Sequence, residues 1–285
     1  MAVEVRKVFL MDEQGNVIDC LLRSSFFNDL GGLGYDDSIT YMDYGDGFFS
    51  PVKRSMKQGT ISGTMSFLNR DTAYEDYRKL MNWVSKAEML RNDYALKLCY
   101  RPYGGDTFMK DVILTSVSKG ELDVGGFLSC SVSFTGLTPW YMVTSMKITS
   151  STIGNVAGVN LPLYLDADTD GRYYMELSGN FAGMSIRFRD SSGTSYGLMD
   201  MTDSAYAITG SDSLVFSTIP GNIGLWKKDS GGTLTNLIDQ ITFQNGLEAF
   251  PLLLNRENLT VLFRTTSSSH SFTGNVNVYS YWKTR

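Results

Sequence analysis

The feature that most constrains the fold is a long stretch, from about residue 145 to the end, in which short apolar runs alternate with turn clusters. Clusters such as SSGTS and DSGG contain the residues that favour tight turns between strands. No window here carries the three-and-four spacing of an amphipathic helix. The stretch therefore predicts a β-sandwich or jelly roll. Its strands are expected near residues 145–149, 161–166, 172–178, 184–189, 196–201, 205–209, 213–217, 223–227, 238–243, 250–254, 259–265 and 273–282.

The first half predicts more strands and a single helix. Apolar and polar residues alternate over 126–134, which is typical of a strand with one buried face. A helix is expected to begin at the cap candidate Asn69 or Asp71, because one apolar stripe follows at steps of four and three. The stripe consists of Ala73, Tyr77, Leu80, Val84 and Ala87. Further strands are expected near 4–11, 17–22, 60–67, 94–100 and 107–114.

Between these strands lies a segment rich in glycine, acids and aromatic residues, from about residue 26 to 59. Its composition predicts a long loop or an extended arm rather than regular structure. A proline and a change to a composition poor in charge and rich in Ser, Thr, Gly and Asn follow at 136–141. The chain is therefore expected to be mainly β, with two domains, 1–143 and 144–285.

Composition excludes several classes of function. The formal net charge is -5, so the basic excess needed to neutralise nucleic-acid phosphates is missing and sequence-specific nucleic-acid binding is not expected. No window approaches the roughly 18 to 20 apolar residues of a membrane span, and the start lacks an uninterrupted apolar signal region. We therefore expect a soluble product made in the cytoplasm, without membrane partners. Cys20, Cys99 and Cys130 lie in apolar runs without CxxC spacing and are expected to be buried free thiols.

Catalytic motifs are scarce, which predicts a protein that is not an enzyme. The sequence contains one histidine, His270, inside a serine-rich turn, and no nucleophile elbow, metalloprotease or phosphate-loop motif. The glycines at 31–34 lack the following helix that a phosphate site requires. Carboxylates are plentiful, so composition leaves a glycoside hydrolase open as an alternative, although no spacing supports one.

One calcium site is conceivable at Asp166, Asp168 and Asp170, since alternating carboxylates followed by Gly171 can wrap oxygen ligands around this ion. Glu176 comes one position too early to close a twelve-residue calcium loop, so a turn rich in aspartate is the other interpretation. No other cofactor is expected.

Aromatic residues of the second half raise the possibility of a sugar site. Tyr174 and Trp226 are the candidate carbohydrate-binding residues, because sugars stack on such side chains in β-sandwich lectins. The alternative is that these aromatic residues fill the core or pack along the strands.

Several segments of the first 141 residues, taken in order, resemble the N-terminal domain of the distal tail proteins of long-tailed (siphovirus-type) bacteriophages that infect Gram-positive bacteria. The most specific segment is FTGLTPWY at 134–141, directly before the change in composition. The others are DYGDGFF at 43–49, YEDYRKLMNWV at 74–84, LKLCYRP at 96–102 and SKGEL at 118–122.

This resemblance implies a baseplate hub. The first domain would be a β-sandwich with one helix and an arm or hairpin, six copies of which close into a ring at the tail tip. The second would be a peripheral galectin-like β-sandwich. The ring would join the tail tube of major tail protein to the tail-tip or tail-associated lysin protein. It would also carry receptor-binding proteins and pass the DNA through its channel, in virions assembled in the host cytoplasm.

A ring needs contacts between unlike surfaces of neighbouring copies, and the glycine-rich aromatic segment 30–67 is the candidate to make them. The residues expected at this interface are Tyr35, Tyr41, Tyr44, Phe48 and Phe49. Two other functions stay open besides the enzyme: a carbohydrate-binding tail protein that recognises host cell-wall saccharide through the second domain, and a tail-tube subunit, which would need little more than the first domain.

Overall fold

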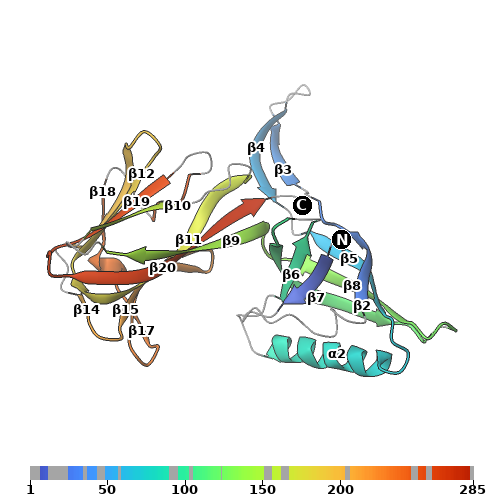
Figure 1. Ribbon diagram of the computed structural model, residues 1–285. Helices are drawn as coiled ribbons and strands as arrows, with labels where there is room; N and C mark the ends of the chain where they lie inside the picture. The colour runs from blue at the N-terminus through green and yellow to red at the C-terminus, as the bar shows by residue number, and fades with distance from the viewer. Residues whose placement is uncertain are drawn as a thin grey trace. The chain divides into compact units, whose positions relative to one another are not determined.

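The computed structural model describes residues 7–11, 25–34, 37–43, 49–56, 59–89, 96–102, 105–122, 124–150, 156–161, 167–202, 206–244, 250–254 and 259–282. Within these ranges the chain is mainly β, its strand pairs are antiparallel and it has one α-helix, as the sequence predicts (Figure 1). The residues fall into two compact units, one ending at Met142 and joined by Trp282, the other running from Val143 to Tyr281.

The first unit is built on one antiparallel sheet with the order β9–β7–β8–β5–β2, in which β6 also pairs with β7 and β1 with β6. Residues at alternate positions of the central strands are buried, among them all four apolar residues that alternate in β8. The bounds are β1 Lys7–Met11, β2 Ser25–Gly31, β5 Thr60–Phe67, β6 Leu96–Arg101, β7 Phe108–Lys119, β8 Leu128–Gly136 and β9 Trp140–Thr149.

The single described helix, α2, runs from Ala73 to Met89. It begins after Thr72, whose carbonyl accepts the first helical hydrogen bond from Asp76 and whose hydroxyl donates to the Asp76 carboxylate. The cap is therefore Thr72 rather than the expected Asn69 or Asp71, because the chain makes a turn over residues 70–72 first. Ala73 and Leu80 are buried, and the Tyr77 ring meets Phe67 of β5 edge to face at 6.3 Å, so the helix lies on the sheet.

The segment read as a loop or arm contains three strands. β2 pairs with β5, which the sequence did not indicate, because its glycine and acidic residues break the alternation that marks a strand. β3 (Asp37–Asp43) and β4 (Phe49–Met56) pair with each other and form a two-stranded sheet of their own (Figure 1). We call residues 37–56 the arm. The strand expected at 17–22 lies outside the described residues.

The second unit is a sandwich of two antiparallel sheets. The larger has the order β17–β16–β15–β11–β20, with the second part of β9 beside β20 and β14 beside β11; the smaller has the order β10–β19–β12–β13–β18. The bounds are β10 Val156–Leu161, β11 Thr169–Ala182, β12 Met184–Arg189, β13 Ser195–Asp200, β14 Ala207–Ile208, β15 Ser213–Ile219, β16 Asn222–Lys228, β17 Leu234–Asn236, β18 Thr242–Gln244, β19 Leu259–Thr265 and β20 Ser271–Trp282.

Side chains from both sheets interdigitate in one core. Tyr173 of β11 stacks obliquely on Phe188 of β12 at 5.7 Å, and Phe272 of β20 meets Phe263 of β19 at 6.3 Å. Ring contacts of this kind join the two layers, so the sandwich predicted for the second half is confirmed. Its expected likeness to galectins stays a prediction.

Two hairpin turns of the second unit repeat the same design. In DSSGT and DSGGT the first aspartate, Asp190 or Asp229, accepts two backbone hydrogen bonds through its Oδ1 atom. Gly193 and Gly232 adopt φ of 83° and 86°, a conformation that favours glycine. Hydrogen bonds lower the pKa of both aspartates, for Asp190 chiefly the one from the Ser192 hydroxyl and for Asp229 chiefly the one from the Thr233 amide. The turn chemistry of the sequence therefore sets where β12–β13 and β16–β17 reverse.

Some expected strands of this unit are wrong. Residues 238–240 form a short 3-10 helix, before β18, and residues 250–254 contribute a single bridge between Gly171 and Leu253 rather than a strand. Residues 238–240 are exposed, whereas their neighbours Leu237 and Ile241 pack on the core, as Phe250 and Leu254 of the second run do. Whether such a run pairs depends on partners far away in the sequence. β17 has three exposed residues and therefore carries no apolar signal.

Cys99 and Cys130 are buried free thiols, as predicted, whereas Cys20 lies outside the described residues. Burial raises the pKa of Cys99 to about 12 and that of Cys130 to about 11, which makes both thiols poor nucleophiles. Among the described helical residues, no helix has the length and apolar character needed to cross a membrane.

Candidate functional site

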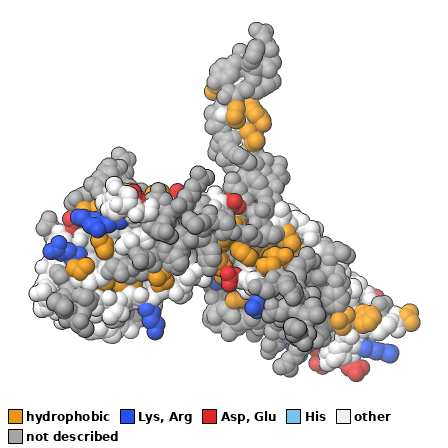
Figure 2. Space-filling model, turned by 45° about the horizontal axis from the view of Figure 1, so that its top comes forward, with side chains coloured by type: hydrophobic (Ala, Val, Ile, Leu, Met, Phe, Trp, Pro, Cys, Tyr) orange, Lys and Arg blue, Asp and Glu red, His pale blue; other side chains and the backbone are white. Residues whose placement is uncertain are grey.

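The arm exposes large apolar side chains. Ile39, Tyr41 and Met42 of β3 have 40%, 56% and 48% of their surface exposed, and hydrophobic side chains are visible on the arm in Figure 2. Tyr41 is thus exposed, as an interface residue has to be in the isolated chain. Phe49 opens β4 opposite Asp43, whereas Tyr35, Tyr44 and Phe48 lie outside the described residues. An isolated two-stranded hairpin is marginally stable in water, and exposed apolar patches often mark interaction sites, so this surface is a candidate interface.

The base of the arm is held tightly to the first unit. Gly32 adopts φ of 79°, and a Cβ atom at this position would overlap the carbonyl oxygen of Thr60. The next residue, Leu33, accepts a hydrogen bond through its carbonyl from Trp140 Nε1 at 3.3 Å. Trp140 is fully buried. Gly32 and Leu33, directly after β2, are therefore anchored to β5 and β9.

Trp140 also covers a buried lysine. Lys110 of β7 is 5% exposed, and its Nζ atom lies 5.6 Å from the centre of the Trp140 ring, at a distance typical of a cation–π contact. Gly136 makes room for this side chain, because a Cβ atom there would come within 2.5 Å of Lys110 Cε. Burial lowers the pKa of Lys110. The sequence shows this lysine as an ordinary polar position of a strand, and no pattern marks it.

The lowered pKa of Lys110 predicts a pH dependence of stability. Between the folded-state pKa and the unfolded value of about 10.4, the unfolded chain binds one more proton at this site, so the contribution of Lys110 to stability rises with pH. Chemical denaturation of wild type and Lys110→Met from pH 7 to 10.5 measures it. The free energy of unfolding of Lys110→Met minus that of wild type should decrease by up to about 1.4 kcal/mol per pH unit in this window.

The variant has to be compared with wild type, because the raised pKa values of Cys99 and Cys130 make the stability of both proteins fall as the pH rises. Ser116→Met, at an exposed position of the same strand and without an ionisable group, is the matched control and should keep a constant difference from wild type. A pH-independent difference for Lys110→Met would contradict the lowered pKa.

A second apolar surface lies where the β7–β8 connection meets the start of α2. Leu68, Tyr74, Val124 and Phe127 are all exposed there. The Tyr74 hydroxyl donates to Glu121 Oε2 at 2.9 Å, and Lys119 Nζ lies 4.6 Å from the centre of the Tyr74 ring. These contacts attach the β7–β8 connection to the start of α2 and hold this surface in place.

In the second unit, the outer face of the larger sheet carries both carbohydrate candidates. Tyr174 of β11 pairs with Ser217 of β15, which pairs with Gly224 of β16. In the next row of the same face, Glu176 pairs with Val215, which pairs with Trp226. Tyr174 and Trp226 are therefore one row apart on two strands separated by β15, and both are half-buried.

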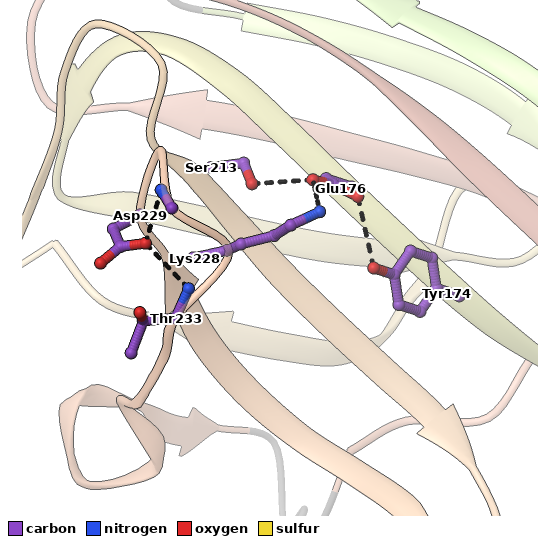
Figure 3. Close-up of polar contacts among 7 residues, drawn as sticks. Tyr174, Glu176, Ser213, Lys228, Asp229 and Thr233 are labelled. Atoms are coloured by element: carbon purple, nitrogen blue, oxygen red, sulfur yellow. Dashed lines mark hydrogen bonds and ion pairs between the residues drawn. The ribbon is translucent and has the colours of Figure 1, made fainter. Parts of the chain in front are cut away.

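Glu176 is the centre of a polar network on this face (Figure 3). Ser213 Oγ donates to Glu176 Oε1 at 2.8 Å, Lys228 Nζ donates to the same oxygen at 3.0 Å, and the Tyr174 hydroxyl donates to Oε2 at 3.3 Å. Partial burial alone would raise the pKa of Glu176, but the hydrogen bonds from Lys228 and Ser213 outweigh it and the pKa is lowered. Burial and the neighbouring carboxylate raise the pKa of Tyr174 to about 12. The carboxylate is therefore held charged and oriented.

The calcium candidates are partly described. Asp168 and Asp170 are exposed at the start of β11, where the Asp168 amide donates to the carbonyl of Tyr281, whereas Asp166 lies outside the described residues. The described residues contain no group of three or more His, Cys, Asp or Glu arranged to hold a metal ion. Calcium binding here stays a prediction. His270 accepts a long hydrogen bond at Nδ1 from the Ala182 amide at 3.5 Å, in the turn where the sequence places it.

Comparisons with known proteins agree with this architecture. Residues 7–137 match the model of the distal tail protein N-terminal domain. A chain of the phage P2 baseplate in its activated conformation with Ca superimposes with a TM-score of 0.58 at 14% identity, covering 95% of this chain and 98% of that chain. The SPP1 Dit protein, described as a paradigm of the hub adsorption apparatus in phages infecting Gram-positive bacteria, gives a TM-score of 0.55 at 9% identity, with the same coverage. No curated protein matches the sequence significantly.

At these identities the two superpositions show a common fold, and the matched domain adds the class: the chain is a β-rich structural protein of phage tails. More particularly, through residues 7–137 it belongs to the distal tail protein family. The resemblance carried by segments such as FTGLTPWY is thereby confirmed.

Proposed function

We propose that this chain is a baseplate hub that forms a six-membered ring at the tail tip of a phage. The ring joins the tube of major tail protein to the tail-tip or tail-associated lysin protein, carries receptor-binding proteins and leaves a channel for the DNA. It works by binding, with no catalytic step. The Gram-positive host follows from the resemblance described above and stays a prediction.

The arm is the observation that supports this function best. It is a two-stranded sheet whose strand β3 exposes Ile39, Tyr41 and Met42, and it is anchored at its base by Gly32 and Trp140. Contacts between unlike surfaces close into a ring when the rotation between copies allows it. A firmly based arm with exposed apolar residues is suited to reach a neighbouring copy and bury that surface.

The family and the structural neighbours support the same role. Distal tail proteins are named for their position in the tail, and the two neighbours with the same fold are described as parts of a baseplate and of a hub adsorption apparatus. In our proposal residues 1–143 form the ring and residues 144–285 the peripheral domain. The net charge of -5 suits a channel that must not retain a passing polyanion.

The solution mass of the purified chain, with negative-stain images of the main peak, tests this proposal. A mass near six times 31.7 kDa together with ring-shaped particles would support it. If the chain alone is a monomer, the measurement is repeated with the major tail protein and the tail-tip protein of the same phage. A chain that stays monomeric with both partners would contradict the ring.

A further inference from the structure

The Trp226 ring lies over Gly224 on the outer face of the second unit. A Cβ atom built on Gly224 would lie 2.6 Å from Cζ2, 2.7 Å from Cη2 and 3.2 Å from Cε2 of Trp226. Three ring atoms so nearly equidistant mean that the face of the indole, not its edge, covers Gly224. The ring therefore lies flat against the strand, where any side chain at 224 would displace it, and its second face is turned away from the sheet.

Trp226 is half-buried, so part of that second face is accessible to a ligand. Its Nε1–H makes no hydrogen bond to any described residue. A flat aromatic ring that is accessible on a sheet surface is a platform on which the apolar face of another ring can stack. The ring can lie flat because Gly224 has no side chain.

Polar groups with unused hydrogen-bonding capacity border this platform. Lys228, two residues further along β16, uses one of its three N–H groups on Glu176, and Asn236 of β17 stands opposite Trp226. Asn236 accepts a bond from the Ile238 amide at its Oδ1 atom, which leaves its Nδ2 donors for another partner. Glu176 lies in the same row as Trp226 but on β11, with β15 between them. Polar groups thus lie on both sides of Trp226, Asn236 on the neighbouring strand and the Glu176–Lys228 pair across β15.

The two charges of the Glu176 network compensate each other, which limits the kind of ligand. Glu176 and Lys228 form an ion pair at 3.0 Å with about a third of each side chain exposed, 31% and 39%. Stacking of nucleic-acid bases would need a basic groove beside the ring, whereas the cation of this network, Lys228, is paired with Glu176. A neutral ring with many hydroxyl groups fits both the platform and its polar border.

We propose that the outer face around Trp226 binds a neutral saccharide. A pyranose ring stacks on the indole, and its hydroxyl groups bond to Lys228, Asn236 and the oriented carboxylate of Glu176. Tyr174 serves as a support in this site, because its hydroxyl is engaged by Glu176 and the site has one stacking platform. The site is independent of ring formation, so it goes beyond the proposed hub function.

A glycan array probed with the full-length chain tests the proposal, followed by calorimetric titration with the best oligosaccharide. The array contains neutral hexose and N-acetylhexosamine oligosaccharides together with sulfated and sialylated ones. We expect a neutral oligosaccharide to bind, and binding to weaken at least tenfold in Trp226→Ala. Gly224→Ala should weaken it similarly although every polar group and the tryptophan remain, since the new methyl group lifts the indole from the strand.

Ile223→Ala is the matched control, because this exposed residue lies on the same strand next to Gly224 and outside the site. Its affinity should equal that of wild type, and circular dichroism should show that all variants are folded. Binding of charged glycans alone, no binding to any glycan, or unchanged affinity in a folded Trp226→Ala would each overturn the proposal. The solution mass of the same samples reports on the ring separately.

Discussion

A chain in which Ile39 and Tyr41 are both replaced by aspartate is expected to fold but not to form rings. The solution mass should fall from that of about six chains to that of one. Both side chains are exposed on the arm, at 40% and 56%, so their replacement leaves the core of the isolated chain intact. At an interface each new carboxylate would be buried without a partner, which costs several kcal/mol, and the cost recurs at every contact of the ring.

The matched control is Ile223→Asp combined with Leu234→Asp. These residues of the second unit are 54% and 53% exposed, so the added charge and the lost apolar surface are comparable. This variant should keep the wild-type mass. Light scattering of both variants and of wild type, at one protein concentration, makes the comparison. Rings formed by the arm variant as readily as by wild type would mean that the arm is not the interface.

Trp140→Ala is expected to lower the free energy of unfolding of the first unit by about 3–5 kcal/mol, the usual cost of removing a large buried aromatic side chain. The indole is fully buried, contacts Tyr100 at 6.2 Å between ring centres and covers the buried end of Lys110. Its loss also leaves the carbonyl of Leu33 without its hydrogen bond, so the base of the arm should loosen as well.

Hydrogen exchange read peptide by peptide measures this effect, because the two units can unfold separately and a single midpoint would mix them. Exchange should accelerate in the peptides of β5, β7 and β8 and in those leading into β3, but not in the sandwich of the second unit. Trp140→Phe, which keeps most of the apolar volume and loses the hydrogen bond, should cost only about 1 kcal/mol. Equal exchange in wild type and Trp140→Ala would show that this residue does not hold the arm.

Much of the fold could be predicted because alternation is a local signal. The four apolar residues of β8 are buried, and β12 and β19 begin and end where their apolar runs do. The stripe of α2 was equally clear. The runs at 238–243 and 250–254 look like strands for the same reason, but within them only residues 242 and 243 pair along a partner strand, β13. Residues 238–240 form a 3-10 helix, and residues 250–254 contribute a single bridge.

Some residues of the candidate sites could be identified from the sequence, and others could not. Tyr41 and Trp226 were identifiable as aromatic candidates, whereas Lys110, Gly224 and Glu176 were not. A glycine two residues before a tryptophan in a strand is the one local signal that could have suggested the platform, since both side-chain positions face the same side. Nothing local distinguishes Glu176 from other acids, because its partners Ser213 and Lys228 are brought to it by strand pairing.

The sequence by itself determined the alternating strands, the helix stripe, the aspartate–glycine turns and the ordered segments that mark a distal tail protein. These features depend on residues close together in the chain. The tertiary structure alone decided that β3 and β4 form a separate arm, that Trp140 anchors its base and that Trp226 lies flat beside the Glu176 network. Each of these depends on the register between strands distant in sequence, and that register is set by packing over the whole unit.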